Sequence, residues 1–148
     1  MFTIKLATIQ DVDDIVRLNK EAFGDRKELK WSWDRKYISK SIRFNRYVMK
    51  VDGVLVGAIH YFKEKHKLYL SSIALFKEYR GLGYGKELMK FLEKQARVMK
   101  KGEVEIEARA VNSGFYMKLG YKPDFSSGSS SDIWSGYITY TKDLTCTE

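Results

Sequence analysis

The segment of the sequence that is richest in chemical information is Arg80-Gly81-Leu82-Gly83-Tyr84-Gly85. It follows a strand-like run, Leu68–Phe76, and precedes a stretch in which apolar residues recur at helical spacing. The backbone N–H groups that open a helix have no partner inside the helix, and glycines let an anion approach them closely. The spacing therefore predicts a loop that binds a phosphate group.

Three known patterns of anion-binding loop compete for this segment. The P-loop pattern would place glycine at Arg80 and serine or threonine at Glu87, so it fails at both positions. The dinucleotide-binding pattern would place its third glycine at Lys86, and no complete βαβ unit surrounds the segment. The pattern that remains is R-x-x-G-x-G, formed by Arg80, Gly83 and Gly85.

Alternating strand-like and helix-like stretches lead up to the loop. Thr8-x-x-Asp11 has the form of a capping box and predicts a helix that stops at Gly24, and Ser32 is the expected cap of a second helix. Asp52-Gly53 predicts a tight hairpin, since both residue types tolerate a positive φ. The expected elements are a strand at Phe2–Leu6, the two helices (the second carrying Trp33, Tyr37, Ile38 and Ile42), hairpin strands at Tyr47–Val51 and Val54–Lys63, and the strand Leu68–Phe76.

After the loop the pattern continues as helix, strand, short helix and strand. Glu103–Ala110 alternates charged and apolar residues, which predicts a strand with two distinct faces. The remaining expectations are a long helix that ends at Gly102, a short helix from Ser113 to Leu119 that Gly120 and Pro123 terminate, a Ser-rich loop over residues 126–132, and a last strand from Trp134 to Leu144. The sum is an α/β domain of about seven strands and about four helices.

Length and composition exclude several classes of protein. A chain of 148 residues predicts one domain, and the single cysteine, Cys146, excludes an intrachain disulfide scaffold. The longest apolar run, Val54–Ile59, is far shorter than the roughly 20 residues that span a bilayer. Lys5 stands where a signal peptide would need its apolar core. We therefore expect a cytoplasmic protein with no membrane partner.

The net charge is +8, from 27 Lys and Arg against 19 Asp and Glu. A solvated basic surface explains this balance, and so does attraction to an anion such as a phosphorylated cofactor or nucleic acid. Because the cations are spread along the chain and no RNA-binding aromatic motif or zinc knuckle is present, we expect no nucleic-acid partner.

Three segments resemble parts of the GNAT superfamily, the acyl-CoA-dependent N-acetyltransferases. Leu70–Gly85 resembles the family's strand, p-x-y-R-G-x-G-x-G turn and helix start, with Lys77 in place of the frequent proline. Phe115–Pro123 resembles its F-Y-x-x-x-G-F/Y segment, and Ile4–Leu18 is similar to its first strand and helix. The resemblance implies a single N-acetyltransferase domain over residues 1–148, with a mixed, mostly antiparallel sheet and helices on both faces.

The resemblance implies acetyl-CoA as cosubstrate. The amides of Leu82 to Lys86 would hold its pyrophosphate, unless the segment is a plain tight turn. The pantetheine arm would pair with the open edge of the strand before the loop, and an N–H near Leu75 would polarise the thioester oxygen. Asn112 is either a helix cap or a CoA contact. The expected cosubstrate-binding residues are Ile73, Ala74, Leu75, Arg80, Gly81, Leu82, Gly83, Tyr84, Gly85, Lys86 and Asn112.

Tyr116 is the expected general acid. When a primary amine attacks the acetyl carbon directly in a ternary complex, the departing thiolate needs a proton, and a phenol of pKa about 10 can deliver one. Glu107 is the expected base that takes a proton from the amine. The non-catalytic alternatives are that Tyr116 is an aromatic residue packed under the short helix and that Glu107 is a solvated carboxylate on its strand. Glu105 is a weaker candidate base, and His60 is more typical of a structural strand histidine.

The acceptor pocket is expected near Trp31 and Trp33, with Tyr137 and the Ser-rich loop on the same side, although both tryptophans could equally pack as core. Phe115 and Tyr121 are expected in the core. No spacing suggests a metal site, and Cys146 has no histidine partner that would make it a nucleophile, so we expect no metal and no covalent acyl-enzyme.

The expected partners are acetyl-CoA and an amine acceptor on a small molecule or protein. The last strand also leaves an edge through which a homodimer could form. Two alternatives stay open at this point: a non-catalytic acyl-CoA-binding regulatory module, which would keep the loop and lose Tyr116, and an acetyltransferase that a basic surface directs to a nucleic-acid-linked acceptor.

Overall fold

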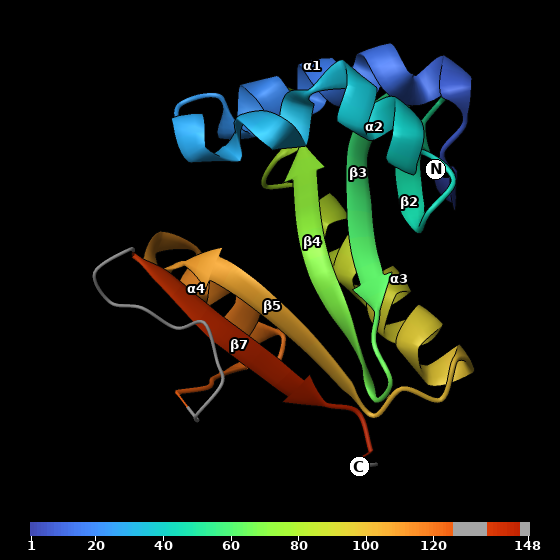
Figure 1. Ribbon diagram of the computed structural model, residues 1–148. Helices are drawn as coiled ribbons and strands as arrows, with labels where there is room; N and C mark the ends of the chain where they lie inside the picture. The colour runs from blue at the N-terminus through green and yellow to red at the C-terminus, as the bar shows by residue number, and fades with distance from the viewer. Residues whose placement is uncertain (126–135, 146–148) are drawn as a thin grey trace. The chain divides into compact units, whose positions relative to one another are not determined.

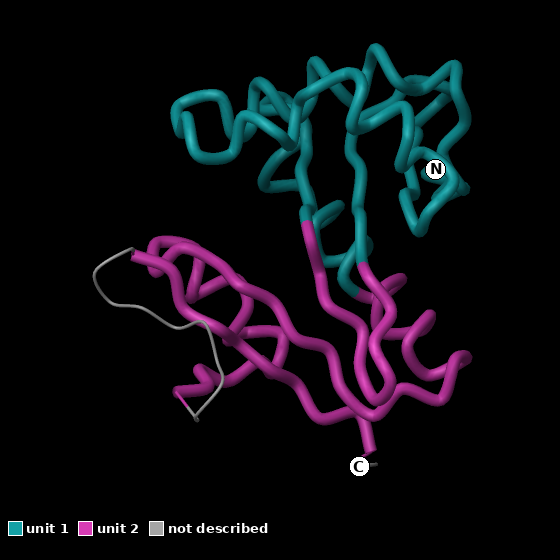
Figure 2. Tube along the Cα trace, viewed as in Figure 1, with its two compact units in different colours: residues 1–61, 72–89 teal, residues 62–71, 90–148 magenta. Residues whose placement is uncertain are grey.

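The computed structural model describes residues 1–125 and 136–145, so the expected Ser-rich loop, Trp134 and Cys146 lie outside the described residues. Figure 1 shows the helices and strands along the chain, which divides into two compact units (Figure 2). Unit 1 comprises residues 1–61 and 72–89, and unit 2 comprises residues 62–71 and 90–148.

The described residues form seven strands, four α-helices and four short 3-10 helices. The strands are β1 (Phe2–Leu6), β2 (Arg46–Val51), β3 (Val54–Lys63), β4 (Lys67–Leu75), β5 (Glu103–Arg109), β6 (Lys122–Pro123) and β7 (Tyr137–Asp143). The α-helices are α1 (Val12–Phe23), α2 (Arg35–Ser41), α3 (Tyr84–Val98) and α4 (Ser113–Lys118). The 3-10 helices are η1 (Ile9–Asp11), η2 (Lys27–Trp33), η3 (Lys77–Tyr79) and η4 (Ala110–Asn112).

Hydrogen bonding places the strands in the order β1-β2-β3-β4-β5-β7-β6. β1 pairs antiparallel with β2 and β2 with β3, and in unit 2 β7 pairs antiparallel with both β5 and β6. β4 and β5 are parallel, with Lys67–Leu70 opposite Glu103–Ile106. The mixed, mostly antiparallel sheet expected from the sequence is confirmed.

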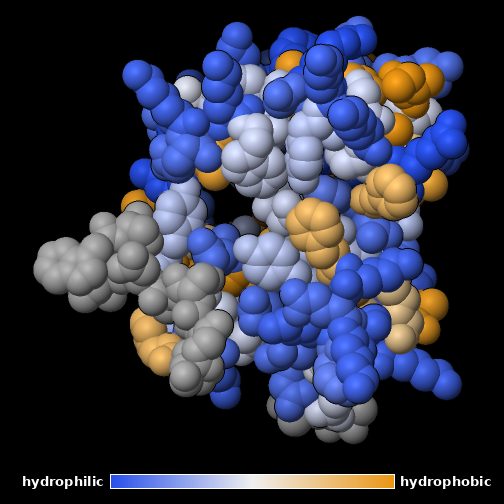
Figure 3. Space-filling model, in the orientation of Figure 1, coloured by the Kyte–Doolittle hydropathy of each residue, from blue (hydrophilic) through white to orange (hydrophobic). Residues whose placement is uncertain are grey.

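The face of the protein shown in Figure 3 is largely hydrophilic. Apolar residues form small separate patches on it. No helix within the described ranges is long and apolar enough to cross a membrane. Several large apolar side chains are nevertheless exposed, among them Ile9, Phe44, Leu82, Val111, Met117 and Phe125.

The core of unit 1 lies between its strands and helices α1 and α2. Val48, Ala58 and Ala74 of the strands form one cluster with apolar residues of both helices. Neighbouring residues on a strand face opposite sides, so Phe2, opposite Val51 in the register, projects from the other face. There its ring meets Tyr84 edge-on at 6.2 Å. α3 therefore begins on the face opposite α1 and α2.

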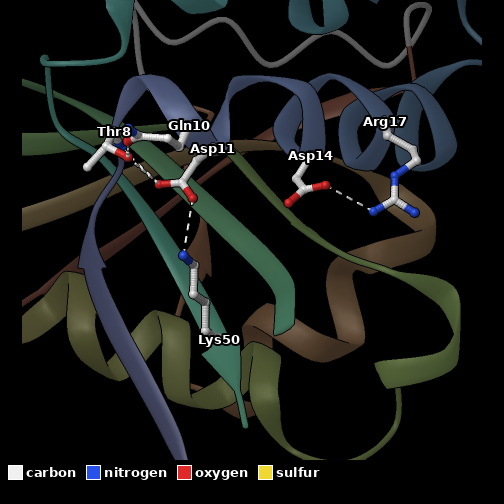
Figure 4. A network of polar contacts seen from close by, with 6 residues as sticks. All are labelled: Thr8, Gln10, Asp11, Asp14, Arg17 and Lys50. Carbon is white, nitrogen blue, oxygen red and sulfur yellow. Dashed lines mark hydrogen bonds and ion pairs between the residues drawn. The ribbon is translucent and has the colours of Figure 1, made fainter. Parts of the chain in front are cut away.

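The expected capping arrangement at Thr8 begins the first helical segment (Figure 4). The Thr8 N–H donates to Asp11 Oδ2 at 2.8 Å, and Lys50 Nζ lies 3.3 Å from Asp11 Oδ1. One turn of 3-10 helix precedes α1, which ends at Phe23 before Gly24, as predicted. A buried carboxylate is tolerated here because a backbone N–H and an ammonium group both face it.

The expected cap at Ser32 was wrong. Ser32 is buried within η2, where its hydroxyl donates to Leu29 O at 2.6 Å, so it is already used inside its own turn. Asp34, which has extended backbone geometry, caps α2 instead, and its carboxylate accepts from the N–H groups of Lys36 and Tyr37. The second helix thus starts at Arg35 and excludes Trp33.

Two further boundaries differ from expectation. α3 ends at Val98, and Lys100 then adopts a left-handed conformation (φ 58°), so the turn does not use Gly102. The Gly102 N–H donates instead to His66 O at 2.9 Å. Pro123 does not simply end α4, since it pairs with Tyr140 as part of β6. A proline suits that place because β6 is the outermost strand in the sheet order.

Candidate active site

The glycine loop connects η3 to α3 within unit 1. Gly81 (φ 78°) and Gly83 (φ 90°) both have positive φ, and a Cβ built on either one would have no atom within 4 Å. Gly83 O accepts the first bond of α3, from the N–H of Glu87. The N–H groups that precede Glu87 in the first turn have no helical acceptor. The loop is therefore an open cradle of backbone donors at the positive end of a helix.

Arg80 joins this loop to the end of β4. Its Nε donates to Leu75 O at 3.1 Å, while its side chain stays exposed. The preceding turn is held by the Lys77 N–H, which donates to Glu21 Oε1 at 2.7 Å. Tyr84, the first residue of α3, packs against Tyr79 as well as Phe2. These contacts fix the loop relative to the strand that precedes it.

The last residues of β4 extend beyond its pairing with β5, which ends at Leu70. The Phe76 N–H donates to Val56 O of β3, so alternation along the strand directs the N–H and C=O of Leu75 toward the opposite edge. That carbonyl is the one that Arg80 contacts. The expected open row of backbone groups at Ile73–Leu75 is thus compatible with the observed pairing.

Gly57 of β3 is a residue that the sequence reasoning missed. A Cβ at this position would lie 2.6 Å from Leu75 Cδ2 and 2.9 Å from Ala74 O. Only glycine allows β3 to approach the end of β4 this closely. A glycine inside an apolar strand pattern was the available signal, because such a residue often marks a close backbone approach.

Trp31 and Trp33 lie on η2, also in unit 1. The Trp31 ring meets Tyr37 edge-on at 5.5 Å and remains exposed, whereas Trp33 is half-buried. The sequence left two interpretations of these tryptophans, as walls of an acceptor pocket or as core residues. Exposure favours the pocket wall for Trp31, and partial burial favours packing for Trp33.

His60 of β3 is fully buried, and burial together with the charge of Arg46 lowers its pKa to about 3. It is therefore neutral near pH 7. Its burial agrees with the interpretation of His60 as a structural residue. An imidazole with so low a pKa does not change its charge near neutral pH.

Tyr116 lies on α4 in unit 2 and is 7% exposed. Its ring centroid lies 5.0 Å from that of Phe115 and 6.2 Å from those of Tyr121 and Tyr140. Burial raises the pKa of Tyr116 to about 12. The phenol therefore keeps its proton throughout the physiological range.

The neighbours of Tyr116 differ in burial. Tyr121 is in the core, as expected, and its hydroxyl donates to Glu93 Oε2 at 2.9 Å. The same carboxylate group accepts from Lys142 Nζ at 2.9 Å. The core assignment of Phe115 was wrong: it is 40% exposed, because α4 turns that side of its short helix to solvent.

The two candidate carboxylates of β5 have different surroundings. Val104, Ile106 and Ala108 are buried on one face, and Glu107 is exposed on the other, as predicted. Glu105 is bound by Lys67 Nζ at 2.7 Å. Glu107 is therefore the more exposed of the two candidate carboxylates.

The remaining expected residues also lie in unit 2. Asn112 precedes α4 at the capping position, but its side chain makes no capping hydrogen bond. Tyr137 is half-buried and stands opposite Arg109 in the β5–β7 register. Among the described residues, no group of three His, Cys, Asp or Glu side chains is placed to hold a metal ion.

Comparison with known proteins decides the family. Residues 12–121 match the model of the acetyltransferase (GNAT) family. The chain belongs to this family. An uncharacterized N-acetyltransferase from Chlorobaculum tepidum is 27% identical over 147 residues, which cover 98% of this chain and 91% of that relative. Family membership makes this chain an acyltransferase of the N-acetyltransferase type, as the sequence motifs implied.

Solved structures support the fold of this acetyltransferase. The PaiA N-acetyltransferase of Thermoplasma acidophilum, crystallised with coenzyme A, has a TM-score of 0.82 at 18% identity and covers 97% of this chain and 99% of its own. The ribosomal-protein-S18-alanine N-acetyltransferase of Escherichia coli has a TM-score of 0.77 at 16% identity and covers 100% and 97%. At such low identity the likeness establishes the fold and leaves the acceptor open.

Proposed function

We propose that this acetyltransferase transfers the acetyl group of acetyl-CoA to a primary amine of a small molecule or protein. The observation that carries the proposal is the pair of positive-φ glycines, Gly81 and Gly83, directly before the first turn of α3. Family membership and the coenzyme A bound to the PaiA relative support the same cosubstrate.

The residues of the loop fit the pyrophosphate of CoA. Open space around Gly81 and Gly83 leaves the N–H groups of Leu82 to Lys86 accessible to an anion. Arg80 and Lys86 are exposed and add positive charge, and Tyr84 and Gly85 begin the helix. Bound acetyl-CoA supplies the activated acetyl group, which the amine attacks directly in a ternary complex.

The end of β4 would orient the thioester arm. We propose that backbone groups of Ile73, Ala74 and Leu75 pair with the pantetheine amides, as an added strand pairs with a sheet edge. The Leu75 N–H would then donate to the acetyl oxygen as negative charge develops on it. We place Asn112 among the CoA contacts, since its side chain is not used as a cap.

Tyr116 would act as the general acid. Its raised pKa keeps the phenol protonated, which is the state an acid requires. As the carbon–sulfur bond breaks, Tyr116 Oη donates its proton to the leaving sulfur and regains one from solvent. The products are then the free thiol of CoA and the acetylated amine.

Glu107 would take the proton that the attacking nitrogen loses, directly or through water, because its carboxylate is exposed on β5. Trp31 and Trp33 of η2 and Tyr137 of β7 would contact the acceptor. An aromatic ring with a face open to solvent, such as that of Trp31, can pack against an aliphatic amine.

Calorimetric titration with acetyl-CoA tests the proposal. We expect micromolar binding to the unmodified protein and none to Gly83→Glu, because the new carboxylate repels phosphate and occupies the cradle. Gly53→Glu is the matched control. Gly53 (φ 82°) has the same backbone conformation and the same open surroundings, but it lies in the β2–β3 hairpin.

Equal affinity of Gly83→Glu and the unmodified protein would exclude the loop as the pyrophosphate site. If binding is found, thiol release measured with a panel of primary amines separates an enzyme from a non-catalytic CoA-binding module. An absence of thiol release with every amine and peptide tested would favour the latter.

A further inference from the structure

Unit 1 contains a hollow of about 730 Å³ that the acetyl-transfer site does not use. Its volume lies within the roughly 300–1,000 Å³ typical of ligand sites. We name it the Ile9–Phe44 hollow; its lining residues are Ala7, Thr8, Ile9, Ser39, Lys40, Ile42, Arg43 and Phe44. All of them come from the β1–α1 connection and from the end of α2 with the turn that follows it.

The hollow and the glycine loop lie at opposite ends of the unit 1 strands. The hollow adjoins Leu6 and Arg46, where β1 ends and β2 begins. The loop follows Leu75, and the next residue, Phe76, bonds to Val56 near the start of β3. Val51 of β2 pairs with Phe2 of β1 and with Val54 of β3, so the start of β3, where Val56 lies, is at the Phe2 end of β1. The hollow is therefore a separate surface.

The walls of the hollow are apolar and exposed. Ile9 and Phe44 are 63% and 66% exposed, above a floor that includes buried Ala7 and Ile42. The turn that carries Phe44 is hydrogen-bonded on both sides: its N–H donates to Ser41 O, and the carbonyl of the next residue accepts from the Tyr61 N–H. Phe44 is thus held toward solvent by an ordered turn. Exposed apolar side chains around a concave surface are typical of interaction sites.

The charge of the lining is positive. It contains Lys40 and Arg43 and no acidic residue. The ion pairs observed in unit 1 use Arg17, Arg35 and Lys50 instead. Asp11, the nearest carboxylate along the chain, faces the Thr8 N–H and Lys50. A second copy of this +8 chain would meet like charge here, so charge complementarity selects an acidic partner.

The strand beside the hollow favours a peptide over a lipid. β1 is the outermost strand on its side of the sheet. The Ala7 N–H donates inward to Arg46 O at 2.9 Å, so the alternate residues Leu6 and Ile4 turn their N–H and C=O groups outward. An extended peptide can pair with such a row, whereas a lipid chain cannot.

We propose that the Ile9–Phe44 hollow docks an acidic segment of a partner protein. An apolar side chain of that segment inserts between Ile9 and Phe44, and its carboxylates face Lys40 and Arg43. The inference goes beyond acetyl transfer and does not depend on it, because it uses no residue of the proposed active site.

Fluorescence anisotropy with labelled peptides tests the proposal at physiological salt. The probe is the labelled peptide Asp-Glu-Asp-Leu-Phe-Glu-Asp-Glu, into which the full chain is titrated. In the comparison peptide, Ser-Ser replaces Leu-Phe. We expect saturable binding of the first peptide and at least about tenfold weaker binding of the second, since a buried pair of apolar side chains supplies most of the affinity.

Paired variants separate the hollow from general charge. Lys40→Glu with Arg43→Glu, and Lys27→Glu with Lys30→Glu on η2, each change the net charge by −4, from +8 to +4. We expect the first pair to weaken binding about tenfold and the second less than twofold. Phe44→Ser and Ile9→Ser, both at exposed positions, should each weaken it about fivefold without lowering the melting temperature.

Three results would overturn the proposal: no saturable binding of the Leu-Phe peptide, equal losses in the two charge pairs, or unchanged binding in both Phe44→Ser and Ile9→Ser. Vesicles containing phosphatidylglycerol form the remaining arm. If they bind the chain through Phe44 while the peptide does not, the hollow is a lipid site and the peptide assignment is wrong.

Discussion

The glycine loop of unit 1 is exposed and built mainly from backbone, whereas the cluster of Tyr116, Tyr121 and Tyr140 in unit 2 is buried and built from side chains. In the loop, the groups that we propose to bind phosphate are N–H donors whose direction is set by two positive-φ glycines. In unit 2, the proposed acid, Tyr116, keeps its proton because burial raises the pKa of its phenol to about 12. The glycine loop therefore depends on backbone geometry, whereas the proton state of Tyr116 depends on the exclusion of solvent.

The largest expected effect is on turnover. Tyr116→Phe should lower kcat by about 10²–10³-fold and leave acetyl-CoA affinity within about twofold, because it removes a proton donor and keeps the ring. Tyr121→Phe is the matched control: it removes a neighbouring hydroxyl that bonds to Glu93, so it should lower stability and change kcat only a few-fold. Steady-state kinetics with calorimetry measures both. Unchanged turnover in Tyr116→Phe would exclude it as the acid.

Unfolding at alkaline pH tests the raised pKa of Tyr116. The folded-state pKa of Tyr116, about 12, exceeds the unfolded value of about 10, so its stabilisation is complete below pH 10 and is lost as pH rises toward 12. The loss amounts to about 3 kcal/mol. Urea unfolding from pH 8 to 12 should show a shallower decline in Tyr116→Phe than in the unmodified chain. Equal declines would mean that this phenol is not desolvated.

The next largest expected effect is a loss of stability when the packing at the end of β4 is disturbed. Gly57→Ala should destabilise the protein by about 1–3 kcal/mol, because the added Cβ would lie 2.9 Å from the backbone oxygen of Ala74. Gly114→Ala on α4, where a Cβ meets nothing within 4 Å, is the control and should be neutral or stabilising. Chemical denaturation measures both variants, and equal stabilities would show that β3 can move away from β4 at no cost.

The conformation of the loop has a smaller effect than its charge. Gly83→Ala should weaken acetyl-CoA binding about tenfold, since a left-handed conformation costs an L-residue about 1–2 kcal/mol and the loop relaxes to avoid it. Gly53→Ala carries the same strain in the hairpin and should leave affinity unchanged. Similar affinities for the two variants would mean that the cradle does not require positive φ at Gly83.

The smallest expected effect belongs to Arg80. Arg80→Gln removes the hydrogen bond to Leu75 O and one positive charge, so acetyl-CoA affinity should fall about threefold and kcat should change little. Repeating the titration at higher salt separates the two contributions, because charge attraction is screened and loop orientation is not. A loss that disappears at high salt would assign Arg80 to charge alone.

Most of the fold could be predicted because its signals are local. The Asp52-Gly53 hairpin forms as expected, with φ of 49° and 82° at its two residues, and β5 has the predicted buried face. Boundaries were harder to predict. Ser32 and Asp34 are both good caps, and the choice depended on Ser32 being buried with its hydroxyl bound to Leu29. Sequence spacing carries no information on such competition.

By itself, the sequence determined most of the elements and their order, the glycine loop and the family, because turn chemistry, hydrophobic period and motif spacing are properties of short segments. Only the tertiary structure decided which side chains are desolvated. His60 is neutral, Tyr116 keeps its proton, and Phe115 is exposed although its neighbour Tyr116 is buried. Desolvation depends on atoms brought from distant parts of the chain, so proton states and exposed docking surfaces follow from packing and not from residue type.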